Sequence, residues 1–171
     1  LHDRATTGGD RILAQGRSPA MTAHLSLDVI VNAPVESVFD AFTQWSRQDE
    51  WMLGTRVEVR HGDGRSRYSE IAGWTGIGPI GFWDTMTITR WEPPYRVDVV
   101  HTGALVRGTG TMEVLALPDG RSRFVWSEGL VPPLGALGRV GWPVVKPAFA
   151  AGVRRSLRVF ATLVESGTLP R

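Results

Sequence analysis

The chain has 171 residues, of which 42% are hydrophobic and 21% charged. This composition is typical of one compact domain and excludes a chain that is disordered over most of its length. Cysteine is absent, which excludes disulfides, thiol catalysis and thiolate metal sites. The net charge is only +2 and no run of five basic residues occurs, so we expect no nucleic-acid partner.

Residues 1–20 are polar, contain glycine and lack apolar periodicity. We therefore expect a flexible leader ahead of a single domain over residues 21–171. The leader holds no continuous apolar stretch of the kind a secretory signal needs, which makes the cytoplasm the expected location.

The first expected elements are a strand and two short helices. Apolar and polar residues alternate over residues 24–32, which predicts a strand with one buried face. Pro34 suits the first position of a helix, whose apolar residues then recur at three-and-four spacing: Val35, Val38, Phe39 and Phe42. A second short helical turn is expected over residues 45–51.

Six further strands follow in succession. They are expected over residues 55–61, 66–73, 82–91, 96–102, 106–117 and 121–128. The short connections contain Gly, Pro and Asp, which predicts an antiparallel meander. Its longest connection is the glycine-rich segment 73–81.

That segment contains the dinucleotide-binding pattern G-x-G-x-x-G between Gly76 and Gly81. The motif requires a following helix, whereas the next residues favour a strand, and Pro79 lacks an amide donor. We interpret the segment as a flexible strand connection and expect no nucleotide cofactor.

From residue 147 onward, apolar residues recur at helical spacing, which predicts an amphipathic helix of about twenty residues that ends near Gly167. This helix can cover the buried face of the sheet. Pro132, Pro133 and Pro143 are expected to interrupt the chain before the helix.

Residues 130–145 are rich in apolar side chains, which permits two interpretations. The favoured one is a lid or helix lead-in over a cavity; the other is a flap that contacts a membrane transiently, helped by Arg139 and Lys146. The apolar residues concerned are Leu134, Leu137, Val140, Trp142 and Val145.

The order strand, two short helices, six strands and long helix indicates an α+β domain. Over about residues 24–168, four segments also carry a family resemblance: VNAPVESVFDAFTQWSRQDEW, TITRWEPPYRVDVV, DGRSRFVW and RSLRVFATLVESG. Together they resemble the START-like, helix-grip SRPBCC superfamily, in its polyketide cyclase/dehydrase-like branch.

The resemblance implies a curved, seven-stranded antiparallel sheet wrapped on a long C-terminal helix, with a cavity for an apolar small molecule between them. Members of the superfamily include lipid-transfer proteins, coenzyme Q-binding proteins and polyketide aromatase/cyclases. Many of them bind a ligand without catalysis, so the fold alone does not define the function.

Candidate polar groups for such a cavity follow from strand parity. Asp84, His101 and Glu128 each share a strand face with apolar residues. In a perfectly regular hairpin, Asp84 and His101 would lie on opposite faces of the sheet, because one number is even and the other odd. A bulge near Arg90 and Trp91 would bring them to the same face. The three groups either point inward, as ligand-orienting or acid/base residues, or lie at strand ends in water, which is the favoured alternative.

The tryptophans and histidines complete the list of candidate residues. Seven Trp residues occur, and most are expected to pack in the core. The four histidines, His2, His24, His61 and His101, have no metal-ligand spacing, so no metal or cofactor is expected. The predicted cavity walls are Trp51, Met86, His101, Met112, Trp126, Glu128, Phe149 and Val153.

Two functional hypotheses result. The favoured one is non-catalytic binding, for transport or sequestration, of a hydrophobic small molecule such as a lipid, quinone or polyketide. The alternative is a polyketide aromatase/cyclase or dehydratase in which His101, Glu128 or Asp84 moves protons. We expect a monomer or a homodimer.

Overall fold

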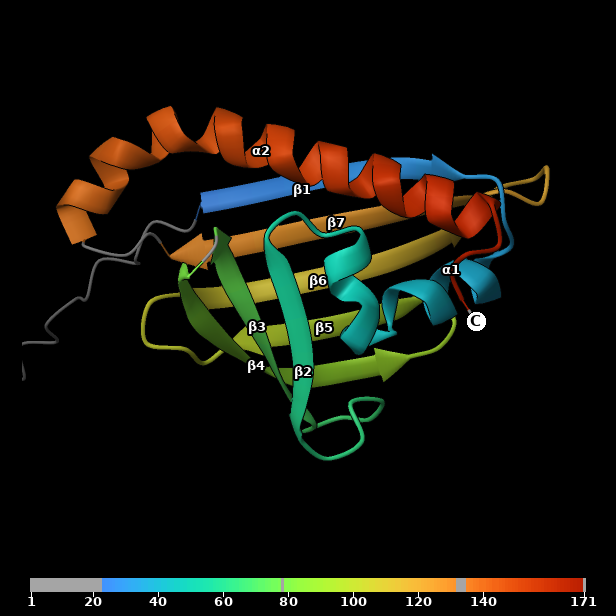
Figure 1. The fold of residues 1–171 in the computed structure, drawn as a ribbon, viewed down its shortest axis with the longest axis horizontal. Coiled ribbons are helices and arrows are strands. Elements are labelled where there is room, and N and C mark those ends of the chain that lie inside the picture. The colour runs from blue at the N-terminus through green and yellow to red at the C-terminus, as the bar shows by residue number, and fades with distance from the viewer. Residues whose placement is uncertain (1–22, 78, 132–134, 171) are drawn as a thin grey trace, which may run out of the picture.

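Seven antiparallel strands form one curved sheet, and a long helix lies across it (Figure 1). The computed structural model describes residues 23–77, 79–131 and 135–170. The strand order is β1-β7-β6-β5-β4-β3-β2, so every neighbouring pair except β1 and β7 is consecutive in the chain. This arrangement confirms the predicted helix-grip architecture. The predicted leader lies outside the described residues.

The elements follow the predicted order. They are β1 (Ala23–Val31), α1 (Val35–Phe42), the 3-10 helix η1 (Trp45–Glu50), β2 (Thr55–His61), β3 (Glu70–Ile77), β4 (Ile80–Glu92), β5 (Arg96–His101), β6 (Arg107–Ala116), β7 (Ser122–Val131) and α2 (Gly135–Glu165).

One face of the sheet is buried because apolar residues alternate along its strands. In β1, Leu25, Leu27 and Val31 point inward, and the polar residues between them are exposed. Helix α2 covers this face with a stripe at three-and-four spacing: Ala150, Val153, Leu157, Phe160 and Val164.

A continuous row of aromatic rings fills part of the space between the sheet and the helices. Trp51 packs on Phe160 of α2, and Phe160 packs on Phe124 of β7. Phe124 packs in turn on Phe42 of α1, and the ring centroids of these three pairs are 4.9 to 5.0 Å apart. Phe39 and Trp91 extend the row at 5.1 and 5.4 Å. These edge-to-face and stacked contacts fix η1, α1 and α2 against the sheet.

The glycine-rich segment is not the long loop that its composition predicts. Strands β3 and β4 stay paired up to Ile77 and Ile80, so most of the segment is hairpin. Gly76 and Gly81 lie opposite each other. A Cβ on Gly76 would collide with the backbone of Ile80 and Gly81 and with the ring of Trp74, and one on Gly81 with the same ring and the Thr75 carbonyl. Glycine is therefore needed here because backbone and indole approach closely, and the prediction of a loop was wrong.

The terminal helix is also longer than predicted. It spans 31 residues and contains Pro143 and Pro147, so Pro143 does not interrupt the chain as expected. Each proline removes one backbone hydrogen bond and favours a bend, and the axis of α2 bends in its N-terminal part (Figure 1). Pro132 and Pro133 lie outside the described residues.

The aromatic row predicts a large effect of truncating Phe160, whose side chain is fully buried between Trp51 and Phe124. We expect Phe160→Ala to lower the free energy of unfolding by about 3–5 kcal/mol, measured by urea denaturation. Arg158→Ala, at an exposed position of the same helix, should cost less than about 1 kcal/mol. Equal losses in the two variants would contradict this assignment of the core.

Candidate functional site

A cavity of about 400 Å³ lies between the inner face of the sheet and α2. All eight predicted wall residues line it: Trp51, Met86, His101, Met112, Trp126, Glu128, Phe149 and Val153. Strand parity and helical spacing thus place their side chains on one cavity. Their contact with a ligand stays a prediction.

A β-bulge decides which polar groups reach this cavity. Next to the β4–β5 turn, the strands pair in one register, which ends at the pair Arg90 and Asp98. Farther from the turn, beginning at the pair Ile88 and Val99, the register is shifted by one residue. The predicted bulge is confirmed, one or two residues before Arg90 and Trp91. Its extra residue, Thr89, puts His101 on the same face as Asp84.

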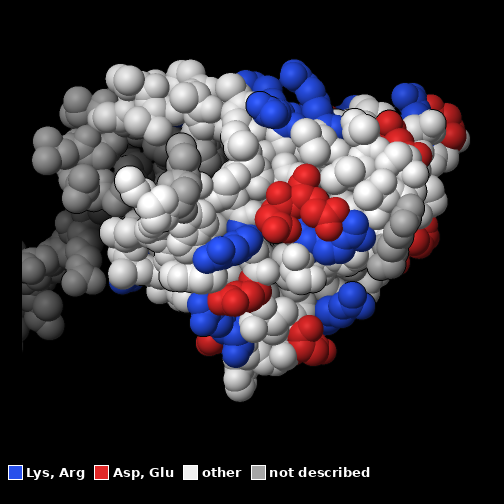
Figure 2. Space-filling view, viewed as in Figure 1, with Lys and Arg blue, Asp and Glu red and all other residues white. Residues whose placement is uncertain are grey.

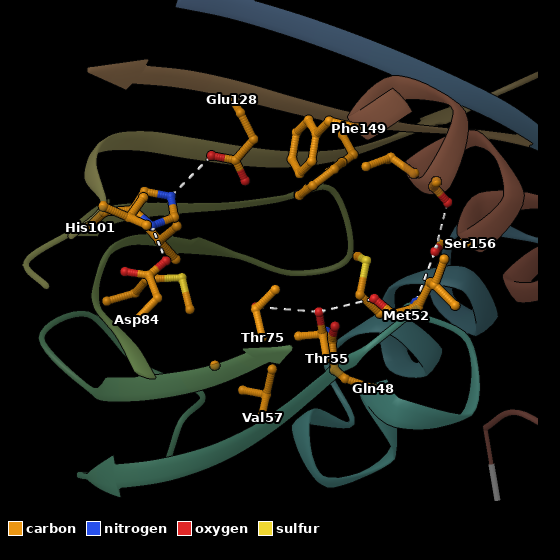
Figure 3. Close-up of a pocket in the computed structure, with 18 of the residues that line it drawn as sticks. Gln48, Met52, Thr55, Val57, Thr75, Asp84, His101, Glu128, Phe149 and Ser156 are labelled. Carbon is orange, nitrogen blue, oxygen red and sulfur yellow. Dashed lines mark hydrogen bonds and ion pairs between the residues drawn. The ribbon is translucent and has the colours of Figure 1, made fainter. Parts of the chain in front are cut away.

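Asp84, His101 and Glu128 form one hydrogen-bonded cluster on the wall of the cavity (Figure 3). His101 Nδ1 lies 2.6 Å from Asp84 Oδ2, and His101 Nε2 lies 3.0 Å from Glu128 Oε2. All three residues are buried, so the favoured alternative, exposure to water at strand ends, was wrong. The groups can be buried because each supplies a partner for the next.

Glycine at position 110 makes room for this cluster. Gly110 of β6 lies between Val99 of β5 and Glu128 of β7 in the sheet. A Cβ at this position would lie 2.9 Å from Val99 Cγ2 and 3.1 and 3.2 Å from the Glu128 carboxylate oxygens. The missing side chain lets the carboxylate lie across β6 and reach the imidazole of His101.

The cluster shifts the pKa values of two of its members. Burial alone lowers the pKa of His101, but hydrogen bonds and charge from Asp84 and Glu128 outweigh it and raise the pKa to about 9. Burial raises the pKa of Glu128, and the neighbouring imidazolium offsets part of that rise. At neutral pH, His101 is therefore an imidazolium that donates both of its N–H groups.

Glu128 is the member of the cluster that can meet a ligand. Both ring nitrogens of His101 are bonded to carboxylates. The second carboxylate oxygen of Glu128 points into the cavity beside Phe149 (Figure 3). This oxygen can accept a hydrogen bond from a ligand, or exchange a proton with it when the carboxyl group titrates.

Two buried polar atoms have no hydrogen-bond partner in the described part of the chain: Asp84 Oδ1 and Trp51 Nε1. Both belong to residues that line the cavity. Neither atom itself is exposed to the cavity, so these two atoms do not identify the ligand contacts.

The opposite side of the cavity carries polar residues that strand and helix patterns did not single out. Thr55 and Thr75 lie opposite each other on β2 and β3, with their hydroxyls 3.5 Å apart. Ser156 of α2 accepts a hydrogen bond from the Leu53 amide at 3.0 Å, and Gln48 donates to the Phe42 carbonyl. Parity would have identified Thr75 if residues 73–81 had been assigned to a strand.

The tryptophans divide between the cavity and the rest of the fold. Trp45, Trp51 and Trp126 line the cavity. Trp74 and Trp83 instead lie on the outer sheet face, where the Arg56 guanidinium sits 5.1 and 5.7 Å from their ring centroids. The side chain of Trp142 lies outside the described residues, as do those of Leu134, Leu137 and Val140 in the predicted lid.

Within the described ranges, no group of three or more His, Asp or Glu side chains could hold a metal ion. No helix in this part of the chain combines the length and the apolar character needed to cross a bilayer.

The pKa of His101 predicts how stability depends on pH. Between pH 6.5 and about 9, the folded chain holds a proton on His101 that the unfolded chain has lost. The stabilisation is therefore complete below pH 6.5 and is lost as the pH rises through 9, by on the order of 3 kcal/mol. The raised pKa of Glu128 likewise makes the folded state less stable as the pH rises, at lower pH values than His101 does.

This dependence can be measured as the free energy of urea unfolding between pH 6.5 and 9. The variant His101→Gln should show a much flatter profile, because the coupled proton is gone. His61→Gln removes an exposed histidine and should keep the wild-type profile. A wild-type stability that does not fall over this range would contradict the ionised cluster.

Comparison with solved structures supports the fold. The Zhui aromatase/cyclase from Streptomyces sp. R1128 aligns with a TM-score of 0.71 at 13% identity, over 87% of this chain and 97% of that one. Protein TTHA0849 from Thermus thermophilus aligns with a TM-score of 0.69 at 14% identity, over 85% and 99%. Protein CV1439 from Chromobacterium violaceum aligns with a TM-score of 0.60 at 19% identity, over 83% and 96%.

At such low identities these structures are similar in fold alone. No curated protein sequence matches the chain significantly. A family model, however, matches residues 22–165, which is most of the chain and includes every member of the Asp84–His101–Glu128 cluster. The protein therefore belongs to the family described as polyketide cyclase / dehydrase and lipid transport, the SRPBCC-type branch that its sequence resembles.

Proposed function

We propose that this protein binds a hydrophobic small molecule, such as a lipid, quinone or polyketide, in the cavity between its sheet and α2, for transport or sequestration. The observation that carries the proposal is the cavity itself. Protein interiors are normally packed to the density of organic crystals, whereas here about 400 Å³ stays open between apolar walls. That volume lies within the range of small-molecule sites, roughly 300–1,000 Å³.

The walls combine apolar surface with two polar regions. Trp51, Met86, Met112, Trp126, Phe149 and Val153 supply apolar surface, and the two methionines can adapt to the shape of a ligand. His101 and Glu128 belong to the charged polar region, and Thr55, Thr75, Gln48 and Ser156 form the uncharged one on the opposite side. We assign Glu128 the direct contact with a polar group of the ligand and His101 the role of holding that carboxylate. A cytoplasmic setting agrees with the absence of cysteine.

A bulkier residue at Gly73 tests the cavity. Gly73 lines it, and a Cβ at this position would meet its nearest atom, Met86 Cε, at an ordinary 3.5 Å. Gly73→Val should therefore fill part of the cavity without straining the sheet, since valine favours strands. We expect the affinity for the apolar fluorescent probe N-phenyl-1-naphthylamine to fall by about tenfold, with an unchanged melting temperature.

The matched control is Ala116→Val, which adds a larger side chain at the exposed end of β6. It should bind the probe like the wild type. Native mass spectrometry of the purified protein adds an independent measure, since a co-purified lipid, quinone or polyketide would identify the ligand class. Absence of saturable probe binding by the wild type would refute the proposed function.

A second candidate is an enzyme of the polyketide aromatase/cyclase or dehydratase kind. The observation that favours it is a buried carboxyl group with a raised pKa that faces the cavity, the usual property of a general acid or base. In this case Glu128 would exchange the proton with the substrate. His101 and Asp84 would be positioning residues, because both nitrogens of the imidazole are already bonded.

This candidate predicts that Glu128→Gln lowers the turnover of a poly-β-ketone substrate by at least about 10²-fold. His101→Gln and Asp84→Asn should also reduce turnover and shift its pH profile, because they change the environment of the Glu128 proton. Glu113→Gln, on the outer face of the sheet, is the control. Unchanged turnover in all three cluster variants would remove this mechanism and leave the binding function.

A further inference from the structure

One end of the molecule exposes aliphatic side chains from four separate segments. The β3–β4 turn and the β5–β6 loop lie at the end where α2 begins (Figure 1). The η1–β2 connection adjoins the β3–β4 hairpin, where the Gly76 amide donates to the Gly54 carbonyl, and lies below the middle of α2, where the Leu53 amide donates to Ser156. Every large aliphatic side chain that is more than half exposed within the described residues lies in these three segments or in the N-terminal part of α2: Leu53 (61%), Ile80 (80%), Leu105 (55%), Val144 (80%) and Val145 (55%). We call these five residues the apolar rim.

The apolar rim adjoins the cavity. Leu53 itself lines the cavity, and so does Phe82, two residues after Ile80. Val106, next to Leu105, is also a lining residue, as is Ala148 one helical turn after Val144. The same segments therefore present apolar side chains both to the cavity and to the outside.

The charges at this end have one sign. Segments 52–55, 79–81, 102–107 and 143–149 contain two charged residues, Arg107 and Lys146, and no carboxylate. Neither cation has an ion-pair partner in the described part of the chain. Figure 2, drawn from the same side as Figure 1, shows a mostly uncharged described surface at this end. Exposed apolar surface with adjacent cations is complementary to the surface of an anionic bilayer.

The shape of the apolar rim distinguishes a bilayer from a protein partner. Its residues project from two hairpin ends, one connection and one helix, and do not form a single helix or strand face that a protein segment could pair with. A bilayer interface accommodates separate projecting side chains, each inserted independently among the lipids.

We propose that this end of the molecule docks on the surface of an anionic lipid bilayer. The apolar rim inserts at the boundary between headgroups and acyl chains, and Arg107 and Lys146 contact the anionic headgroups. An apolar ligand then passes between the membrane and the cavity without crossing water. This inference rests on the proposed function, since it assigns the source of the cavity ligand.

The test is co-sedimentation of the full chain with vesicles of phosphatidylcholine alone or mixed equally with phosphatidylglycerol. We expect binding to the mixed vesicles that weakens with added salt. Ile80→Asp, Leu105→Asp and Val144→Asp should each lower the partition coefficient by about tenfold, the loss expected for one buried aliphatic side chain. Arg107→Glu and Lys146→Glu should weaken binding to the mixed vesicles only.

Leu115→Asp is the matched control, because Leu115 is an exposed aliphatic residue of β6 outside the apolar rim. It should sediment like the wild type, and all variants should keep the wild-type melting temperature. Wild-type protein that stays in the supernatant with both vesicle types would overturn the inference. So would a Leu115→Asp variant that loses as much binding as the rim variants.

Probe binding in the same preparations separates this inference from the proposed function. Ile80, Leu105 and Val144 do not line the cavity, so their variants should bind N-phenyl-1-naphthylamine like the wild type. A wild type that binds the probe but neither vesicle type overturns the docking surface and leaves the proposed function. Vesicle binding without probe binding overturns the proposed function, and with it the exchange of a ligand through the apolar rim.

Discussion

The imidazolium of His101 between two buried carboxyl groups is the constraint on which the site depends. A charged group in an apolar interior is tolerated only when its partners lie within hydrogen-bond distance, and here both ring nitrogens have one. Two backbone features make this possible. The bulge at Thr89 turns His101 to the face that carries Asp84, and Gly110 leaves space for the Glu128 carboxylate to cross β6.

One long helix covers a wide, curved sheet, and the space between them is filled at one end and open at the other. At one end, aromatic rings from α1, α2, β7 and the residue after η1 fill the space, from Trp51 through Phe160 and Phe124 to Phe42. At the other end no such row continues in the described chain, and the cavity remains. The single domain thus combines a rigid, well-packed half with an open half, which allows a binding site without loss of the core.

The open half combines polar groups with apolar surface. His101 is the last residue of β5, so the Asp84–His101–Glu128 cluster lies close to the β5–β6 loop, and methionine, valine and aromatic side chains line much of the rest of the cavity. A molecule with a long apolar part and one polar group matches such a lining. Both ring nitrogens of His101 are hydrogen-bonded to carboxylates, so in the proposed function His101 supports Glu128 and Glu128 makes the contact with the ligand.

The sequence by itself determined the order of elements, the α+β class and which side chains of a strand or helix share a face, because side-chain direction there depends only on position along the local repeat. Local composition was a poor guide at two places. The glycines between residues 73 and 81 lie in the paired strands of a hairpin, and α2 continues through Pro143 and Pro147 although proline disfavours a helix interior. Only the tertiary structure decided that Asp84, His101 and Glu128 are buried together. Their meeting depends on the register between three strands, which no local pattern specifies but which packing and hydrogen bonding across the whole sheet do.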